Sequence, residues 1–448
     1  MDMASARRRP AKHAQQQQGQ GGDRQIVLWG ACVLLSSLSL LVAAASTSSG
    51  FGLGAARLTG EGAAAALVRA ATSGHAGGGH GRYCGDADDG DDLASMSVDG
   101  EWVRDGGRRP LYEPGRCPFV DEGFRCRENG RPDGDYATWT WRPRRCTLPR
   151  FDAGKLLGIL RNRRLVFVGD SIGRNQWESM LCMLSSAVAA GEPGAVYEEN
   201  GSPITKHKGF LSFRFRDHNC TVEHYRSPYL VRRGRPPRRA PRRVDTTLQL
   251  GAMDSRARQW KDADILVFNT GHWWNHERLR RLGCYFQDGK KLRLNMSVED
   301  AYQRALDTLQ KWVQKNVNTT KTLVVLRTYS PAHTRDMDGG GCAAETLPEL
   351  NTSKISLHRW PGMLMPASEA SKSSRGAPRL QLLNVTLMTA QRRDGHPSVY
   401  NVAPSPERTA AAAAAAGQRA DCSHWCLPGV PDAWNELLYA VIVKRFWP

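Results

Sequence analysis

The sequence predicts an α/β fold in which helices cover both faces of a mostly parallel central sheet. From residue 151 onward, short apolar runs typical of buried strands alternate with longer segments of helical periodicity. Strands separated by helices indicate βαβ units, which build parallel sheets with sites at the carboxyl ends of the strands. Four Cys and many Pro within residues 81–150 predict a loop-rich N-terminal subdomain stapled by disulfides.

The N-terminus predicts a membrane anchor. Residues 1–25 are rich in Gln and Arg and are expected to form a disordered cytosolic tail. Residues 26–45 carry no charge, which suits a single transmembrane helix, and the basic flank favours a cytosolic N-terminus. A cleaved signal peptide, with an Ala-x-Ala-like site near residues 43–45, is the alternative. Both interpretations send the rest of the chain into the secretory lumen, beginning with a flexible stem over residues 46–80.

The N-terminal subdomain is expected to wrap around the α/β domain, residues 151–448, and not to form a core alone. The strands predicted in that domain are 165–169, 265–268, 323–326 and 380–384. Helices are predicted over 298–315 and around 434–441. Three polar segments interrupt this pattern and are expected to be solvated: the Arg-rich 231–243, then 366–379 and 403–417.

The first strand leads directly to a candidate nucleophile. Leu165-Val-Phe-Val ends at Gly-Asp, and Ser171 then precedes an apolar stripe of helical spacing. Ser171 therefore lies at a strand's carboxyl end and near a helix N-terminus, where free N–H groups favour developing negative charge. The alternative is that Ser171 merely caps the helix, because Ser is a preferred N-cap.

The other end of the chain supplies candidates for a base. Asp421 and His424 are three residues apart, so one loop can place the carboxylate against the imidazole. A serine hydroxyl is weakly nucleophilic at its own pKa and needs such a base. The pattern predicts a triad of Ser171, His424 and Asp421.

Gly-Asp-Ser early and Asp-x-x-His late in a catalytic domain resemble the SGNH or GDSL esterase group, a three-layer α/β sandwich. Six motifs in order make the resemblance closer: Asn129–Asp133, Trp139–Pro143, Leu148–Asp152, Gly169–Gln176, Asn269–Trp274 and Asp421–Gly429. They are similar to the plant trichome birefringence-like family, over roughly residues 83–447. The resemblance implies a Golgi O-acetyltransferase of cell-wall polysaccharides, here a single-pass type II protein of the Golgi membrane with a lumenal catalytic domain.

Two further residues are candidates for substrate contacts. Asn269 follows a predicted strand, and in SGNH-type esterases an Asn at such a place donates to the oxyanion; a turn-closing Asn is the alternative. Arg174 follows Ser171 by one helical turn and either faces the pocket or forms a salt bridge.

The net charge and the cysteine content limit the kinds of partner that the protein is expected to bind. The net charge of +18 suits nucleic acid, a membrane surface or an acidic polysaccharide, and the anchor with lumenal Cys conflicts with nucleic acid. Ten Cys follow the anchor, which is consistent with disulfides, and none has convincing metal-ligand spacing, so no metal is expected. Six sequons predict glycans, at Asn200, Asn219, Asn295, Asn318, Asn351 and Asn384.

The resemblance implies transfer of acetyl groups through an acetyl-Ser171 intermediate. Xylan, at the 2-O or 3-O of its xylosyl residues, is the first expected acceptor; pectin and mannan are alternatives. A polysaccharide acetylesterase and a lumenal polysaccharide-binding scaffold without chemistry are the other function classes. No bound cofactor is expected, but an acetyl donor is required; an acetyl-CoA-derived donor is one candidate.

Overall fold

A computed structural model of the chain describes most of the region after residue 82. The described residues are 83–84, 96–105, 107, 109–188, 192, 194–204, 209–334, 341–355, 380–403 and 420–447. The predicted tail, anchor and stem (residues 1–80) lie outside them, as does the predicted loop over 366–379. Among the described residues, no helix is both long and apolar enough to cross a membrane.

Seven strands form the central sheet, in the order β13-β12-β9-β3-β6-β5-β4. Their bounds are β3 (Arg164–Gly169), β4 (Val196–Glu198), β5 (Phe210–Phe215), β6 (Cys220–Arg226), β9 (Ile265–Asn269), β12 (Leu323–Arg327) and β13 (Gln381–Leu383). Neighbours from β13 to β6 run parallel, whereas β5 and β4 pair antiparallel at one edge. The predicted mostly parallel sheet is therefore confirmed, and the four predicted strands correspond to β3, β9, β12 and β13.

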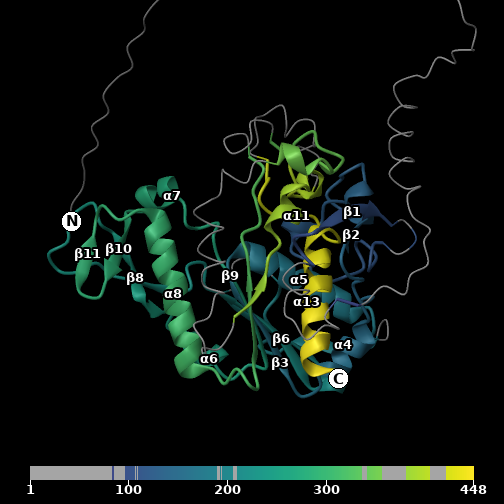
Figure 1. Ribbon diagram of the computed structural model, residues 1–448, viewed down its shortest axis with the longest axis horizontal. Helices are drawn as coiled ribbons and strands as arrows, with labels where there is room; N and C mark the ends of the chain where they lie inside the picture. Colours follow the sequence, from purple (N-terminus) through teal and green to yellow (C-terminus); the bar gives the residue numbers. More distant parts are fainter. Residues whose placement is uncertain are drawn as a thin grey trace, which may run out of the picture. The chain divides into compact units, whose positions relative to one another are not determined.

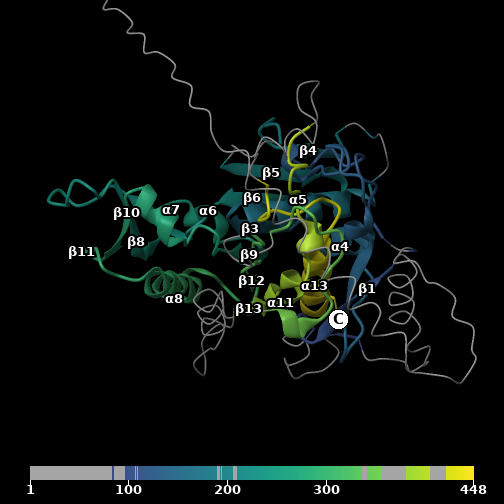
Figure 2. The same cartoon turned by 90° about the horizontal axis from the view of Figure 1, so that it is seen from above.

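Helices cover both faces of this sheet (Figures 1 and 2). Their bounds are α4 (Ala153–Ile159), α5 (Ser171–Ser185), α6 (Ala257–Trp260), α8 (Val298–Asn316) and α13 (Val430–Phe446). Leu165 and Phe167 of β3 pack into the core shared with α4, α5 and α13. Val166 and Val168 pack into a second core with α6 and α8. Because successive side chains of a strand point to opposite faces, the sheet is the middle of three layers.

A second, smaller sheet of order β11-β10-β8-β7 lies beside α8, and the sequence analysis did not predict it (Figure 1). Its strands are β7 (Val231–Gly234), β8 (Thr246–Met253), β10 (Cys284–Asp288) and β11 (Lys291–Arg293). These strands mix polar and apolar residues, so they lack the continuous apolar run of a fully buried strand. The Arg-rich segment begins as β7, and its Arg side chains are exposed, as expected.

The N-terminal segment packs onto the catalytic domain. Its antiparallel pair, β1 (Gly100–Arg104) and β2 (Trp139–Pro143), contributes Trp102 and Trp141 to the same core as α13. The indole N–H of Trp102 donates to the main-chain oxygen of Met388 at 2.7 Å. The described disulfides are Cys84–Cys146, Cys117–Cys182, Cys126–Cys426 and Cys342–Cys422. Two of them join the segment to α5 and to the C-terminal region.

Shorter elements complete the described part. They are α7 (His276–Arg281), α11 (Thr386–Ala390) and the 3-10 helices Glu122–Phe124, Asp135–Thr138, Arg216–His218, Thr352–Lys354 and Arg393–Gly395.

Candidate active site

Ser171 is located where β3 turns into α5. Asp170 caps the helix, because its Oδ1 accepts hydrogen bonds from the main-chain N–H groups of Ile172 (2.9 Å) and Gly173 (3.4 Å). The alternative in which Ser171 is the N-cap is therefore wrong, and its hydroxyl is not used for capping. Ser171 is half-buried between the fully buried Asp170 and Ile172. Its place at the first helical position is where unpaired N–H groups favour negative charge.

Asp421 and His424 form the predicted contact. Nδ1 of His424 donates to Oδ2 of Asp421 at 2.8 Å, and Oδ1 of Asp421 accepts the main-chain N–H groups of Ser423 (3.0 Å) and His424 (3.1 Å). Burial alone lowers the pKa of His424, but the Asp421 charge and hydrogen bond raise it above its ordinary value. Burial also opposes ionisation of Asp421, yet the His424 charge and these hydrogen bonds hold the Asp421 pKa well below its usual range. Since Nδ1 carries a hydrogen, Nε2 is the atom that can take a proton.

Asn175, one helical turn after Ser171, ties the His424 loop to α5. Its Nδ2 donates to the main-chain oxygen of Trp425 at 3.1 Å, and its Oδ1 accepts the main-chain N–H of Trp425 at 2.7 Å. Because Trp425 follows His424 directly, these two bonds hold the backbone next to His424 against the first turns of α5. No pattern in the sequence points to this role, because Asn175 is one of several polar residues in the first half of α5, and only the structure shows that it is buried and bonded to Trp425.

Two disulfides bracket His424. Cys426 is bonded to Cys126 and Cys422 to Cys342, so the loop is attached covalently on both sides of the base. The imidazole ring of His424 also lies 5.4 Å from the ring of Phe124, centroid to centroid. This loop is held by the rest of the protein at several independent points.

Asn269 lies at the carboxyl end of β9 and is buried, at 4% exposed. Its Nδ2 donates to Oδ1 of Asp170 at 2.6 Å. Its Oδ1 lies against both Gly169 and Gly173. A Cβ added at Gly169 would be 1.9 Å from this oxygen, and a Cβ added at Gly173 would be 1.8 Å from it. Asn269 therefore braces the turn that presents Ser171. A role at the oxyanion stays a prediction, which the second hydrogen of Nδ2 allows.

The sequence allows Arg174 either to face the pocket or to form a salt bridge. In the structure it forms a salt bridge with Glu178. Its Nε donates to Oε1 of Glu178 at 2.7 Å, and the Arg174 side chain is 4% exposed. Burial raises the pKa of Glu178 to about 7, although the Arg174 charge opposes this shift. Contact of Arg174 with a substrate stays a prediction.

Two ionisable side chains, His272 and Arg327, influence the ionisation of Asp170. Nδ1 of His272 is 3.9 Å from Oδ2 of Asp170, and Arg327 at the end of β12 is 2% exposed. Burial lowers the pKa of His272 to about 4, an effect that Asp170 opposes and Arg327 reinforces. Burial raises the pKa of Asp170, but its interactions with His272 and Arg327 and its hydrogen bonds from Asn269 and Ile172 together outweigh this effect, so the Asp170 pKa is lowered. The cap of α5 therefore stays ionised.

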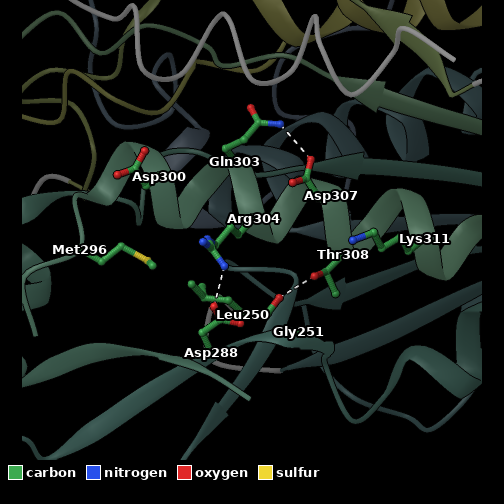
Figure 3. A pocket seen from close by; sticks show the side chains of 10 residues that line it. All are labelled: Leu250, Gly251, Asp288, Met296, Asp300, Gln303, Arg304, Asp307, Thr308 and Lys311. Carbon is green, nitrogen blue, oxygen red and sulfur yellow. Dashed lines mark hydrogen bonds and ion pairs between the residues drawn. The ribbon is translucent and has the colours of Figure 1, made fainter. Parts of the chain in front are cut away.

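A hollow of about 570 Å³ lies elsewhere, against α8 and the second sheet (Figure 3). None of the predicted site residues lines it. Figure 3 shows Arg304 reaching from α8 to Asp288, Gln303 donating to Asp307, and Thr308 donating to the main-chain oxygen of Leu250. Its polar groups largely satisfy one another, so it carries no argument for chemistry.

The predicted glycosylation residues differ in exposure. Five are exposed: Asn200, Asn219, Asn295, Asn318 and Asn351. Asn384 is half-buried, and its Oδ1 accepts from Thr328 Oγ1 at 3.2 Å and from the Thr386 main-chain N–H at 3.3 Å. Asn384 is thus the least accessible of the six.

Two family models match the chain, and they meet between residues 147 and 148. Residues 148–441 match the family described as "GDSL/SGNH-like Acyl-Esterase family found in Pmr5 and Cas1p". Residues 96–147 match the "PMR5 N terminal Domain". The esterase match contains Ser171, Asp421 and His424.

Several curated plant proteins are similar over most of the chain. "Protein trichome birefringence-like 9" of Arabidopsis thaliana is 43% identical over 353 residues, which cover 77% of this chain and 83% of that protein. "Protein trichome birefringence-like 6" of the same species is 44% identical over 349 residues, covering 77% and 70%. "Probable xylan O-acetyltransferase 10" of Oryza sativa subsp. japonica is 34% identical over 355 residues, covering 78% and 77%.

Proposed function

The chain belongs to the trichome birefringence-like family, and from this membership and its serine turn we propose that it transfers acetyl groups to hydroxyls of a cell-wall polysaccharide. The observation that carries the proposal is the bonded Asp421–His424 pair, which Asn175 ties to the helix that begins at Ser171. A protein that only binds glycans has no need of this arrangement.

In the proposed mechanism Ser171 is the nucleophile and His424 the base. Nε2 of His424 removes the hydroxyl proton as Oγ of Ser171 attacks the acetyl carbonyl, while Asp421 holds Nδ1–H in place. The Ser171 N–H and the Asn269 amide stabilise the oxyanion. The donor's leaving group departs with the proton from His424. A sugar hydroxyl then gives its proton to His424 and attacks the acetyl-enzyme. Oγ of Ser171 leaves with that proton from His424, so the sugar carries the acetyl group and the enzyme returns to its starting state.

Xylan is the proposed acceptor, acetylated at the 2-O or 3-O of xylosyl residues. The rice relative that carries xylan in its name supports this choice, at 34% identity. Pectin and mannan are the alternatives within the same chemistry. The acetyl donor is an external substrate, and an acetyl-CoA-derived donor is one candidate.

The proposed location is the Golgi membrane, with residues 26–45 as the anchor and the catalytic domain in the lumen. The four described disulfides support an oxidising compartment.

A trapping experiment tests the proposal. The lumenal part is incubated with a labelled acetyl donor without acceptor, and the labelled peptide is mapped by mass spectrometry. Label is expected on Ser171 and is expected to move to de-acetylated xylan when that acceptor is added. Folded Ser171→Ala protein that still transfers acetyl groups would overturn the covalent mechanism. Release of label only as free acetate, across xylan, pectin and mannan, would make the protein an esterase.

A further inference from the structure

A tryptophan stacked with two arginines lies near the candidate active site. The guanidinium carbon of Arg226 is 5.2 Å from the ring centroid of Trp273, and that of Arg278 is 4.2 Å from it. All three residues are half-buried. We call Arg226, Trp273 and Arg278 the arginine–tryptophan site.

The arginine–tryptophan site shares the sheet edge that carries Ser171. Arg226 ends β6, and its Cα pairs with that of Gly169 in the parallel register of β3, two residues before Ser171. The next residue of the chain, Ser227, donates its main-chain N–H to the Gly169 oxygen at 2.7 Å. Neighbouring strands are about 4.8 Å apart, so Arg226 starts close to the serine turn. Trp273 belongs to the loop that follows β9 on the same edge.

The two guanidinium groups have no acidic partner in the described part of the chain. No ion pair or hydrogen bond joins either side chain to another described residue, whereas Arg131, Arg164 and Arg392 are each bonded to a carboxylate. Stacking uses the face of a guanidinium group and leaves its in-plane N–H groups available as donors. A guanidinium group presents parallel N–H groups that match the two oxygens of a carboxylate or a phosphate.

More positive charge continues from this site along the second sheet. Burial raises the pKa of the Tyr229 hydroxyl to about 12, and the charges of Arg278 and of Arg233 in β7 act against that shift. Tyr229 itself packs edge-on against Trp273 at 5.9 Å. The remaining arginines of the Arg-rich segment are exposed: Arg232, Arg235, Arg238, Arg239, Arg242 and Arg243. Charges spread over such a length suit a polymer with repeated anionic groups better than one compact anion.

We propose that the arginine–tryptophan site binds an anionic group of a substrate, and that this group is the carboxylate of a uronic acid residue in the acceptor polysaccharide. The proposal rests on the proposed function and adds the class of acceptor to it. A phosphate of the acetyl donor would offer the same chemistry to the guanidinium groups. The two sources are separated by presenting each substrate alone.

The test compares two double variants of equal charge change. Arg226→Gln/Arg278→Gln removes the site, and Arg280→Gln/Arg281→Gln removes two exposed charges of α7. The acceptors are a de-acetylated, glucuronic acid-bearing xylan and the same polymer after reduction of its carboxyl groups to alcohols. The site variant is expected to raise KM for the acidic polymer about tenfold, equivalent to about 1.4 kcal/mol, and to leave KM for the reduced polymer unchanged. The control variant is expected to change either KM less than twofold.

Binding measured without turnover separates this proposal from the proposed function. Ser171→Ala protein should bind the acidic polymer more tightly than the reduced one, and the preference should disappear with the site variant. If unaltered protein acetylates no acceptor but keeps this preference, the proposed function fails and the site stands. Equal loss of affinity for both polymers would overturn the site. The site variant could instead acetylate Ser171 more slowly than unaltered protein when acetyl-CoA is the donor, but equally fast with uncharged p-nitrophenyl acetate. That result would assign the site to the donor and overturn the acceptor assignment.

Discussion

His396 lies behind the candidate base, with its Nδ1 2.6 Å from the main-chain oxygen of His424. A carbonyl oxygen only accepts, so Nδ1 donates this hydrogen bond. The His396 ring stacks on Trp425 with centroids 4.0 Å apart, and its Nε2 lies 2.7 Å from Nδ1 of the buried His333. The side chain of His424 is thus oriented by Asp421 while its backbone is fixed by His396. No local pattern in the sequence points to this role for His396.

Replacement of His396 should loosen the base without touching substrate. His396→Phe keeps a ring beside Trp425 but removes the hydrogen bond to the His424 carbonyl. We expect the unfolding free energy to fall by about 1–3 kcal/mol, because a buried carbonyl loses its partner. The kcat for acetyl transfer should fall more than tenfold with little change in KM. His276→Phe, at an exposed histidine, is the control, and equal kcat in both variants would contradict a positioning role for His396.

The pH dependence of kcat/KM should reflect the pKa of His424 in its contact with Asp421. The base works when neutral, and the Asp421 charge raises the His424 pKa, so kcat/KM should rise with pH through a value above about 6.5. Asp421→Asn removes this charge and leaves burial, which lowers the pKa. Activity should therefore fall on the order of 10⁴-fold, while the acidic limb moves to lower pH. Kinetics between pH 5 and 9 measure both effects, with Asp217→Asn at the surface as control. If the acidic limb of the kcat/KM profile lies at the same pH in Asp421→Asn as in unaltered protein, the assignment of His424 as the base is contradicted.

A methyl group at Gly173 should disturb the serine turn. The added Cβ would lie 1.8 Å from Oδ1 of Asn269, so Asn269 must move away from Asp170. We expect Gly173→Ala to cost about 1–3 kcal/mol of unfolding free energy and most of the activity. Gly158→Ala in α4 is the matched control, because nothing lies within 4 Å of its added Cβ; it should be neutral or stabilising by about 0.5–1 kcal/mol. Equal stability and activity of the two variants would show that Asn269 does not brace the turn.

Disulfides beside the base should matter to catalysis beyond their effect on stability. Cys342–Cys422 and Cys84–Cys146 close comparable loops, with sequence separations of 80 and 62 residues. Paired Ser substitutions should therefore cost similar stability, about 2–5 kcal/mol for each bond. Only loss of Cys342–Cys422 should lower kcat at a temperature where both variants remain folded. Urea unfolding and initial rates measure the two quantities, and an equal fall in kcat would mean that the loop is held by packing.

Arg174→Met should test whether this residue serves the fold or the substrate. Without Arg174, the buried Glu178 loses its cation, and we expect a loss of about 3–5 kcal/mol in unfolding free energy at pH 8. The folded-state pKa of Glu178 is already raised to about 7, so the stability that it contributes is present at low pH and declines as pH rises through that value. The loss caused by the substitution should accordingly be smaller at pH 5. Arg216→Met, at a surface ion pair, is the control. Unchanged stability with a raised KM would make Arg174 a substrate contact.

The central layer was predictable because its strands are continuous apolar runs followed by helices. Residues 165–169 and 265–268 carry enough apolar β-favouring side chains to predict strands alone. β6 escaped prediction because Glu223 and His224 occupy its middle, and only tertiary contacts reveal that both are buried. A polar side chain in a strand can be buried when a residue far away in sequence supplies its hydrogen-bond partner. Glu223 is an example, because it accepts a hydrogen bond from Nε of Arg164 at 2.8 Å.

The Asp421–His424 pair was predictable from its spacing, but the parts that support it were not. Asn175 and His396 act through main-chain atoms of the His424 loop, and no local pattern announces such long-range bonds. The role of Asp170 as cap also needed the structure, since Ser171 is an equally good N-cap by type. Sequence thus predicted the candidate reacting groups better than the groups that hold them.

The Cys126–Cys426 bond has a consequence for the order in which the candidate site is assembled during synthesis. Its two sulfur atoms belong to residues made 300 positions apart. At about 5–20 residues per second, translation leaves Cys126 waiting about 15–60 s for its partner. Ser171 is made early in that interval, and His424 is made only at its end. A growing chain therefore carries the candidate nucleophile well before the candidate base, and until then Cys126 can pair only with cysteines other than Cys426.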